Sequence, residues 1–191
     1  ITLAVALMAT FALTRLIWRQ RKTLNKFFML GLTIPIHASI VPIYVTLSRL
    51  HMLNTYWALI IPYAAFSLSM AILVCTGFMN ELPRELDESA CIDGCGVWGI
   101  FFRIIMPLMK PSFAAMGIFV GMNSWNSFIL PVLLLSQKNR TLPVFLETLL
   151  SPYKNNYDLL LVGAVFSVIP IVILFALFQR YFIAGMTAGG I

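Results

Sequence analysis

The segment of residues 81–111, ELPRELDESACIDGCGVWGIFFRIIMPLMKP, is the longest polar interruption in a very apolar chain. It holds five of the seven acidic residues, which are Glu81, Glu85, Asp87, Glu88 and Asp93. A charged side chain at the centre of a bilayer is costly, so such a segment between membrane spans has to lie in water or against another protein. The rest of the chain is therefore arranged around this polar unit.

The pattern within this segment predicts two short helices joined by a glycine turn. Over residues 82–89, apolar and polar side chains recur at spacings of three and four positions, as on one helix. Gly94 and Gly96 then allow the backbone angles that a sharp turn needs. Beyond them, one apolar stripe with helical spacing is formed by Trp98, Phe101, Phe102 and Ile105. Such a unit fits either an amphipathic loop on the membrane surface or a docking surface for a partner protein.

One family has this order of residues in a loop between membrane spans. Its EAA loop runs E-A-A-x-x-D-G, then an aromatic residue, then I-x-L-P, and residues 88–107 resemble it. The matching positions are Glu88, Ser89, Ala90, Asp93, Gly94, Trp98, Phe101, Ile104, Met106 and Pro107. The chain departs from the pattern at Ser89 for alanine and at Met106 for leucine, both mild changes. The resemblance is to the permeases of ABC importers, and it favours the docking interpretation.

In that family the EAA loop docks on the ATP-binding subunit. The resemblance therefore implies a set of docking residues, which are Glu88, Ser89, Ala90, Asp93, Gly94, Trp98, Phe101 and Pro107. Glu88 and Asp93 would supply the acidic contacts and Gly94 the turn. The aromatic side chains of the second arm, Trp98, Phe101 and Phe102, would brace it against the chain's own helix bundle.

The composition is that of a polytopic membrane protein. Hydrophobic residues make up 60% of the 191 residues and charged ones 10%, with a mean hydropathy of +0.91. The net charge of +6 does not indicate nucleic-acid binding, because the basic residues lie at the ends of the apolar stretches. No pattern points to a disulfide framework, a metal site, a cofactor or a catalytic set. No P-loop is present either, so we expect a non-enzymatic subunit whose ATP is hydrolysed by a partner.

The apolar stretches predict an all-α protein with about five membrane spans. They cover residues 1–18, 27–47, 56–78, 112–135 and 159–178. Basic residues without an acidic one among them surround the end of the first stretch, at Arg15, Arg19, Arg21, Lys22 and Lys26. By the positive-inside rule this loop lies in the cytoplasm, and the EAA loop and the C-terminus lie on the same side. Nine of the 13 lysines and arginines are then inside.

The fourth stretch carries an unusual polar run. Asn123, Asn126 and Ser127 are predicted to share one helical face within residues 112–135. Unpaired amides in hydrocarbon are costly, so this face has to look into the helix bundle or a water-filled path. Two interpretations stay open: hydrogen bonds between helices, or a polar lining for a hydroxylated solute, with Trp125 available to stack on a sugar ring. For His37, in the second stretch, the alternatives are a proton carrier and a packed histidine bonded to a neighbouring helix, and we expect the packed one.

The resemblance extends over essentially the whole chain. Residues 123–128 with Pro131, and the glycine-rich tail 185–190, are similar to the maltose-type (MalG-like) sugar branch of permeases with a MetI-like transmembrane domain. Residues 1–191 would form a single such domain, N-terminally incomplete because one of the six usual spans is missing. The tail resembles segments that reach the ATPase interface.

This resemblance implies the transmembrane subunit of a carbohydrate importer, multi-pass in the inner membrane. Its partners would be a dimer of ATP-binding subunits, a second permease subunit, an extracytoplasmic solute-binding protein and membrane lipid. A permease of the same fold for amino acids, peptides or polyamines is the alternative, because the resemblance alone favours sugar. A secondary transporter is more distant, since it usually carries intramembrane acidic residues or inverted repeats, and neither is visible here.

Overall fold

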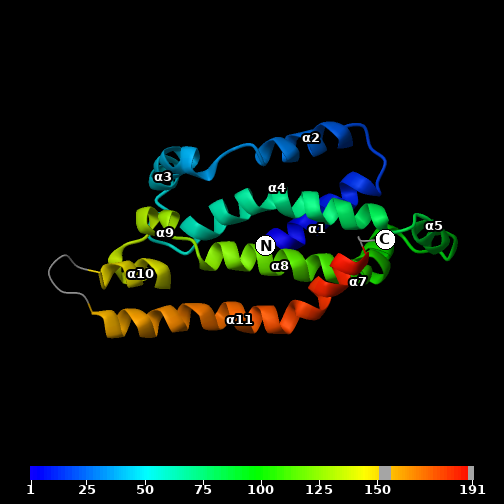
Figure 1. Ribbon diagram of the computed structural model, residues 1–191. Coiled ribbons are helices and arrows are strands. Elements are labelled where there is room, and N and C mark those ends of the chain that lie inside the picture. Colours follow the sequence, from blue (N-terminus) through cyan, green and yellow to red (C-terminus); the bar gives the residue numbers. More distant parts are fainter. Residues whose placement is uncertain (151–155, 189–191) are drawn as a thin grey trace. The chain divides into compact units, whose positions relative to one another are not determined.

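The computed structural model describes residues 1–150 and 156–188, and all regular structure in these residues is helical (Figure 1). The longer helices are α1 (Thr2–Thr14), α2 (Arg21–Gly31), α3 (Ile40–Arg49), α4 (Trp57–Glu81), α8 (Lys110–Trp125) and α11 (Tyr157–Ala188). The shorter ones are η1 (Ile36–Ser39), α5 (Glu85–Ile92), α6 (Val97–Ile100), η2 (Phe101–Ile105), α7 (Met106–Leu108), α9 (Ile129–Leu134), η3 (Gln137–Asn139) and α10 (Leu142–Thr148). The predicted all-α class is confirmed.

Two of the described helices are long and apolar enough to cross a bilayer on their own. α4 has 25 residues with a mean hydropathy of 2.2, and residues 157–179 of α11 reach 2.9. At 1.5 Å per residue these stretches are roughly 34–38 Å long, against a hydrocarbon core of about 30 Å. They match the predicted spans 56–78 and 159–178. α11 continues to Ala188 and so includes the start of the glycine-rich tail, residues 185–190, of which 189 and 190 lie outside the described part.

Residues 27–47, expected to be one span kinked at its prolines, qualify as a candidate span only as part of two helices bent by 91°. α2 ends at Gly31, and a new helical stretch, η1 followed by α3, starts only at Ile36. Pro35 stands at the break with an extended backbone. Proline has no N–H to give to a continuing helix, and its ring keeps the preceding residue out of the helical conformation. This stretch is therefore a broken pair of short helices, and neither part is long enough to span a membrane alone.

The predicted span 112–135 is broken as well. α8 ends at Trp125, and α9 begins only at Ile129. Pro131 explains the break, because in a continuous helix its ring would clash with the carbonyl of Ser127 and leave that oxygen without a donor. In the first turn of α9 the same proline is tolerated. Asn126 and Ser127 therefore do not share a helical face with Asn123, and that expectation is wrong.

The segment after the glycine turn is not one regular helix. α6 passes into the π-helical turn η2, in which the N–H of Met106 donates to the carbonyl of Phe101, five residues earlier. Pro107 gives the reason, since it has no N–H for the carbonyl of Arg103 and its ring disturbs a regular ladder at this point. The arm of residues 97–108 then meets α8 at an angle of 70°.

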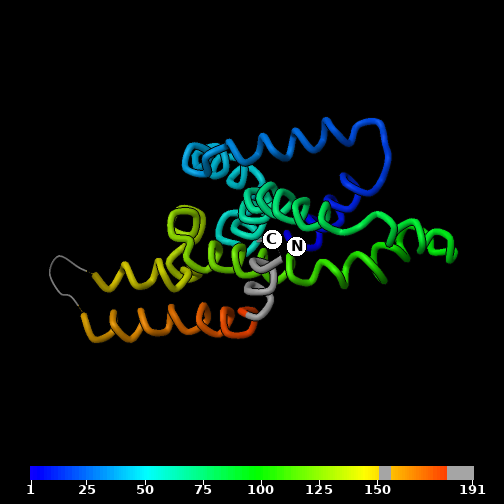
Figure 2. Tube along the Cα trace, turned by 45° about the vertical axis from the view of Figure 1, so that its right-hand side comes forward, coloured from blue at the N-terminus to red at the C-terminus, as the bar shows by residue number. Residues whose placement is uncertain are grey.

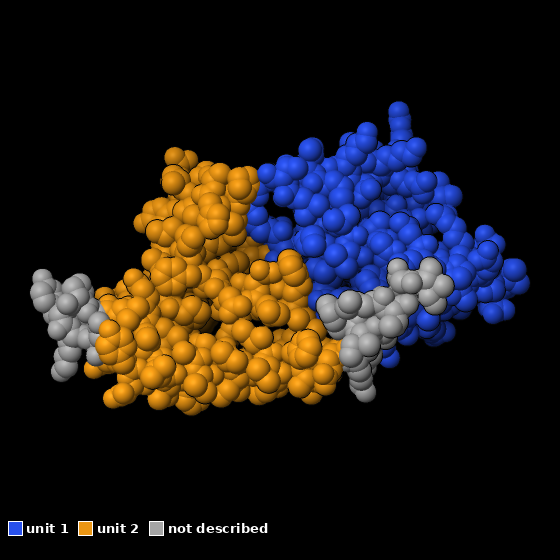
Figure 3. Space-filling view, in the orientation of Figure 1, with its two compact units in different colours: residues 1–34, 64–117, 180–191 blue, residues 35–63, 118–179 orange. Residues whose placement is uncertain are grey.

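The described chain divides into two compact units (Figure 3). Unit 1 comprises residues 1–34, 64–117 and 180–191, and unit 2 comprises residues 35–63 and 118–179. Buried apolar side chains of unit 1 include Leu7, Phe11, Ile72, Met79, Ile105 and Met109. The core of unit 2 is formed by Leu47, Ala58, Leu130 and Leu134. The single transmembrane domain expected for residues 1–191 stays a prediction.

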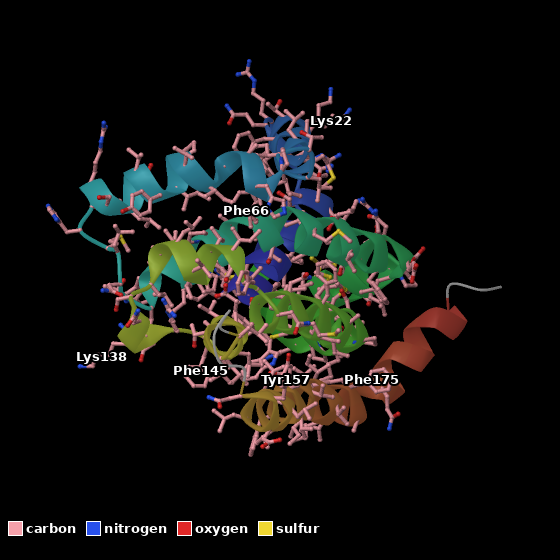
Figure 4. The ribbon with its side chains drawn as sticks, turned by 60° about the vertical axis from the view of Figure 1, so that its left-hand side comes forward. Lys22, Phe66, Lys138, Phe145, Tyr157 and Phe175 are labelled. Carbon is pink, nitrogen blue, oxygen red and sulfur yellow. The ribbon has the colours of Figure 1, made fainter. Side chains whose placement is uncertain are left out.

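α11 carries a long apolar surface. None of the residues in its most apolar window is buried within the chain. Tyr157 and Phe175, both labelled on α11 in Figure 4, are more than half exposed. A contiguous apolar surface of this kind is covered by lipid or by another protein.

Candidate functional site

Residues 81–111, which contain the EAA loop, are called the EAA segment below. Its acidic arm is α5, which projects beyond the C-terminal end of α4 (Figures 1 and 2). Three carboxylates, those of Glu85, Asp87 and Glu88, lie in its first turn. The N-terminus of a helix carries a partial positive charge, which these side chains stabilise. No side chain caps the N-terminus of α5 by a hydrogen bond, so this charge interaction is what favours the start of the helix there.

Gly94 ends α5 in a Schellman motif. Its backbone has a φ of +81°, in the left-handed region that favours glycine. The N–H of Gly94 donates to the carbonyl of Cys91 at 3.0 Å, and the N–H of Cys95 donates to the carbonyl of Ala90 at 2.9 Å. These two bonds satisfy carbonyls at the end of the helix and reverse the chain toward the second arm. The turn predicted at Gly94 thus has a specific backbone geometry.

The structure divides the eight predicted docking residues into two groups. The exposed ones are Glu88, Ser89, Asp93, Gly94, Trp98 and Pro107. Ala90 and Phe101 are buried within unit 1. Six positions of the motif are therefore available to a partner protein, while the other two fix the arms to the chain itself.

The aromatic side chains of the second arm also include both buried and exposed ones. The ring of Phe101 lies 5.1 Å from that of Phe11 on α1, so it braces the arm as expected. Trp98 and Phe102 are 64% and 54% exposed, and their rings stack on each other at 6.0 Å and 23°. Both rings also contact Phe101, at 6.2 Å and 4.9 Å, but more than half of each side chain is exposed. The expectation that these two side chains pack against the bundle is therefore wrong, and they form an exposed aromatic pair. Ile92, at the end of α5, is a further exposed apolar side chain that sequence reasoning missed.

Arg15 is a site residue that sequence reasoning placed only in the basic cluster. Its Nη1 donates to Oδ2 of Asp87 at 2.9 Å. Its Nη2 donates to the carbonyls of Met79 at 2.7 Å and Leu82 at 2.8 Å. The Arg15 side chain is only 5% exposed, so it does not belong to a solvated basic loop. No local pattern could have revealed this contact, because Arg15 and Asp87 are 72 positions apart.

In unit 2 the polar residues of the fourth stretch meet in one pocket of about 290 Å³. The side chains that line it are Ile36, His37, Ile40, Asn123, Asn126, Ser127, Phe128, Ile129 and Leu130. The break after Trp125 therefore still leaves Asn123, Asn126 and Ser127 around the same space. One amide donor of Asn123 is used inside α8, where Nδ2 donates to the carbonyl of Phe119 at 2.9 Å. The volume lies near the lower limit of typical small-molecule sites.

His37 enters this pocket from η1. It is exposed within the chain, which contradicts the expectation of a packed histidine. A neutral imidazole offers one donor and one acceptor, so His37 adds both kinds of group to the polar lining.

Trp125 is not part of this pocket. Its Nε1–H donates to the carbonyl of Ser167 on α11 at 3.0 Å. Its side chain borders a separate hollow of about 80 Å³, together with Gly121 and Pro170. The indole therefore links α8 to α11, and the structure does not bring it together with the three polar residues predicted beside it.

Residues 3–188 match the family described as binding-protein-dependent transport system inner membrane component. The chain belongs to this family. Membership confirms the resemblance drawn from the EAA segment, and with the apolar helices it makes this chain a multi-pass membrane protein.

Two relatives and one solved structure place the chain more closely. It is 48% identical over 171 residues to an arabinooligosaccharides transport system permease protein of Halalkalibacterium halodurans, covering 87% of this chain and 61% of the relative. It is 38% identical over 192 residues to the protein of the same description from Bacillus subtilis, covering 100% of this chain and 68% of the relative. The chain thus spans about two thirds of the length of these relatives. A crystal structure of a bacterial ABC transporter involved in the import of the acidic polysaccharide alginate has the same fold, with a TM-score of 0.75 and 19% identity over 95% of this chain and 69% of that one.

Proposed function

We propose that this chain is the transmembrane permease subunit of an ABC importer for a carbohydrate, and that a separate subunit hydrolyses the ATP. The main support is the EAA segment, whose acidic helix, left-handed glycine turn and aromatic pair belong to unit 1, with six of the eight predicted docking residues exposed. In a member of this family, such a surface is suited to the cleft of an ATP-binding subunit. The segment and the C-terminus would then face the cytoplasm.

The segment can act as a lever on the helices that carry it. An ATP-binding dimer that closes moves the permease only if its contacts differ between the open and closed states. Buried Ala90 and Phe101 hold the two arms on unit 1, so a displacement of the exposed surface is passed on to the attached helices.

The solute class has two supports. The relatives are permeases described for arabinooligosaccharides, and the pocket in unit 2 presents amide, hydroxyl and imidazole groups. Such groups both donate and accept hydrogen bonds, as the hydroxyl groups of a sugar require. We therefore assign Asn123, Asn126, Ser127 and His37 to the solute path. Trp125 would border the path as a packing residue between α8 and α11.

The remaining partners follow from the same assignment. The exposed apolar surface of α11 would face lipid or a second permease subunit. An extracytoplasmic binding protein would deliver the solute to the side opposite the EAA segment.

The test is the ATPase activity of the reconstituted assembly, with and without solute-loaded binding protein, over a panel of sugars and amino acids. We expect stimulation by a sugar-loaded protein and loss of that stimulation in Gly94→Leu. Stimulation only by an amino-acid- or peptide-loaded protein would keep the fold and the coupling surface but overturn the carbohydrate assignment. Full stimulation of the ATPase activity in both Gly94→Leu and Glu88→Lys would refute the assignment of the EAA segment as the docking surface.

A further inference from the structure

Arg15 joins three elements of unit 1 at one point. It lies directly after α1, binds the carboxylate of Asp87 on α5, and binds two carbonyls at the end of α4. We propose that Arg15 is a positioning residue that fixes the acidic arm to the ends of α1 and α4, a role in coupling that rests on the proposed function. A force applied to the exposed face of α5 then reaches both helices through one buried guanidinium.

An arginine suits this position for a geometric reason. The guanidinium is planar and carries five N–H donors in a fixed arrangement, so it can serve acceptors that lie in different directions. Here Nη1 serves the carboxylate while Nη2 serves the two carbonyls. A lysine ammonium is a compact charge on a flexible stem and would not hold the same three acceptors in one geometry.

The end of α4 needs a donor at this place. The last carbonyls of a helix have no partner inside the helix, and the C-terminus carries a partial negative charge. Met79 lies in the last turn of α4, and Leu82 is the first residue after this helix. Arg15 therefore donates to the carbonyl of Leu82 and adds a short bond to the carbonyl of Met79, which otherwise accepts a longer one of 3.4 Å from the N–H of Leu82. Its positive charge is placed where the helix favours one.

Burial makes the link between Arg15 and Asp87 costly to break. The two side chains are 5% and 20% exposed. When one member of a buried ion pair is removed, the other charge is left without compensation. The second oxygen of Asp87, Oδ1, is buried and has no hydrogen bond in the described part of the chain, so the carboxylate is held through Arg15.

Both arms of the EAA segment bear on α1 and the residues that follow it. The first arm does so through Asp87 and Arg15, and the second through the ring contact of Phe101 with Phe11. Two points of attachment to the same helix prevent the segment from pivoting about either one. Arg84 makes a weaker third contact, because this exposed side chain donates to the carbonyl of Thr14 at 3.3 Å.

The experiment compares variants of Arg15 and Asp87 with Arg84→Met, a matched control from the same surface. The full assembly is reconstituted, and three quantities are measured: retention of the ATP-binding subunit, ATP hydrolysis stimulated by solute-loaded binding protein, and solute taken up per ATP. We expect Arg15→Met and Asp87→Asn to retain the ATP-binding subunit, because the docking surface is intact. Uptake per ATP should fall roughly tenfold, within the usual range of coupling between sites. Arg15→Lys should give an intermediate fall in uptake per ATP. Arg84→Met, which removes the longer contact of 3.3 Å with Thr14, should lower uptake per ATP less than any of the Arg15 and Asp87 variants.

A distance measurement separates positioning from loss of fold. Cys91 on α5 is exposed, Cys75 is buried, and Ile17 beyond α1 is exposed. Spin labels on Cys91 and on Ile17→Cys, with Cys95→Ser, should give a narrow distance distribution in the assembly and a broad one after Arg15→Met or Asp87→Asn. A narrow distribution together with unchanged uptake per ATP in both variants would overturn the role of Arg15. Failure of the natural protein to stimulate any ATPase would instead refute the proposed function, while the label distances would still decide whether Arg15 positions the arm.

Discussion

The side-chain oxygen of Ser69 on α4 occupies the space in which Gly31 on α2 would carry a Cβ atom. Small residues at such crossings let two helices approach closely inside a membrane. None of the residues of α2 is buried, and this helix also lies against α1. The contact of Gly31 with Ser69 is therefore one of those that hold the first half of the broken stretch on unit 1.

We expect Gly31→Ala to lower the stability of unit 1 by about 1–3 kcal/mol, the usual cost of overpacking. The measurement is the thermal unfolding temperature of the purified protein in detergent. Gly77→Ala is the control, because a Cβ at Gly77 meets no atom within 4 Å. Ser69→Gly should offset the loss in the double variant. Equal unfolding temperatures for Gly31→Ala and Gly77→Ala would show that the close approach is unimportant.

The left-handed backbone of Gly94 makes a second prediction. A Cβ there meets nothing within 4 Å, so any loss on substitution comes from φ alone. Gly94→Ala should cost about 1–2 kcal/mol in the turn, and Gly94→Asn should cost less because asparagine tolerates this conformation. Gly96→Ala is the control, since Gly96 has a φ of −73° and equally open surroundings. The rate of proteolysis within residues 81–111 and the loss of stimulated ATPase activity should be largest for Gly94→Ala, smaller for Gly94→Asn and smallest for Gly96→Ala. An equal effect of Gly96→Ala would show that the left-handed backbone of Gly94 is not the cause.

Hydropathy predicted α4 and α11 well because every residue of a window adds to the same signal. The breaks at Pro35 and before Pro131 could not be predicted in that way. α4 contains Pro62 and α11 contains Pro170 without ending there, so a proline alone does not decide whether a helix stops. What decides is whether neighbouring elements replace the lost hydrogen bond and make room for the ring.

The candidate site shows the same limit. The motif predicted the turn at Gly94 and six exposed positions, because residues of a short helix–turn–helix mostly contact their neighbours in sequence. Arg15 was missed, since its partners Met79 and Asp87 become neighbours only when α1 packs beside the end of α4. Asn123 and Asn126 were expected to share a helical face; they line one pocket instead, because the chain turns at the break and does not continue as one helix.

We expect the exposed aromatic pair, Trp98 and Phe102, to contribute strongly to the free energy of binding to the ATP-binding subunit. Aromatic side chains at the centre of an interface typically account for about 2 kcal/mol or more each. Trp98→Ala should therefore weaken binding of the ATP-binding subunit by roughly 30-fold, measured by titration of that subunit onto the reconstituted permease. Ile17→Ala is the control, because Ile17 is an exposed apolar residue of unit 1 outside the EAA segment. Unchanged affinity in Trp98→Ala would place the pair outside the interface.

A substitution in the pocket of unit 2 can distinguish a solute path from simple packing between helices. Asn126→Leu keeps a similar volume but removes the amide donors and acceptor from a space it shares with His37 and Ser127. If the sugar passes there, each lost hydrogen bond should cost about 0.5–1.5 kcal/mol, so transport at low solute concentration should fall by roughly two- to tenfold. Uptake of labelled sugar at several concentrations measures this effect.

Trp125→Phe is the matched comparison for that experiment, because it removes the indole donor to Ser167 and reduces the ring beside the separate hollow. It should lower the unfolding temperature slightly and leave the concentration dependence of uptake unchanged. Asn126→Leu with natural uptake and a higher unfolding temperature would mean that the polar run packs helices together and does not contact solute. The opposite outcome is reduced uptake in Asn126→Leu at a normal unfolding temperature of that variant, together with normal uptake in Trp125→Phe. It would place the solute against Asn126, because a general packing defect would reduce uptake in both variants.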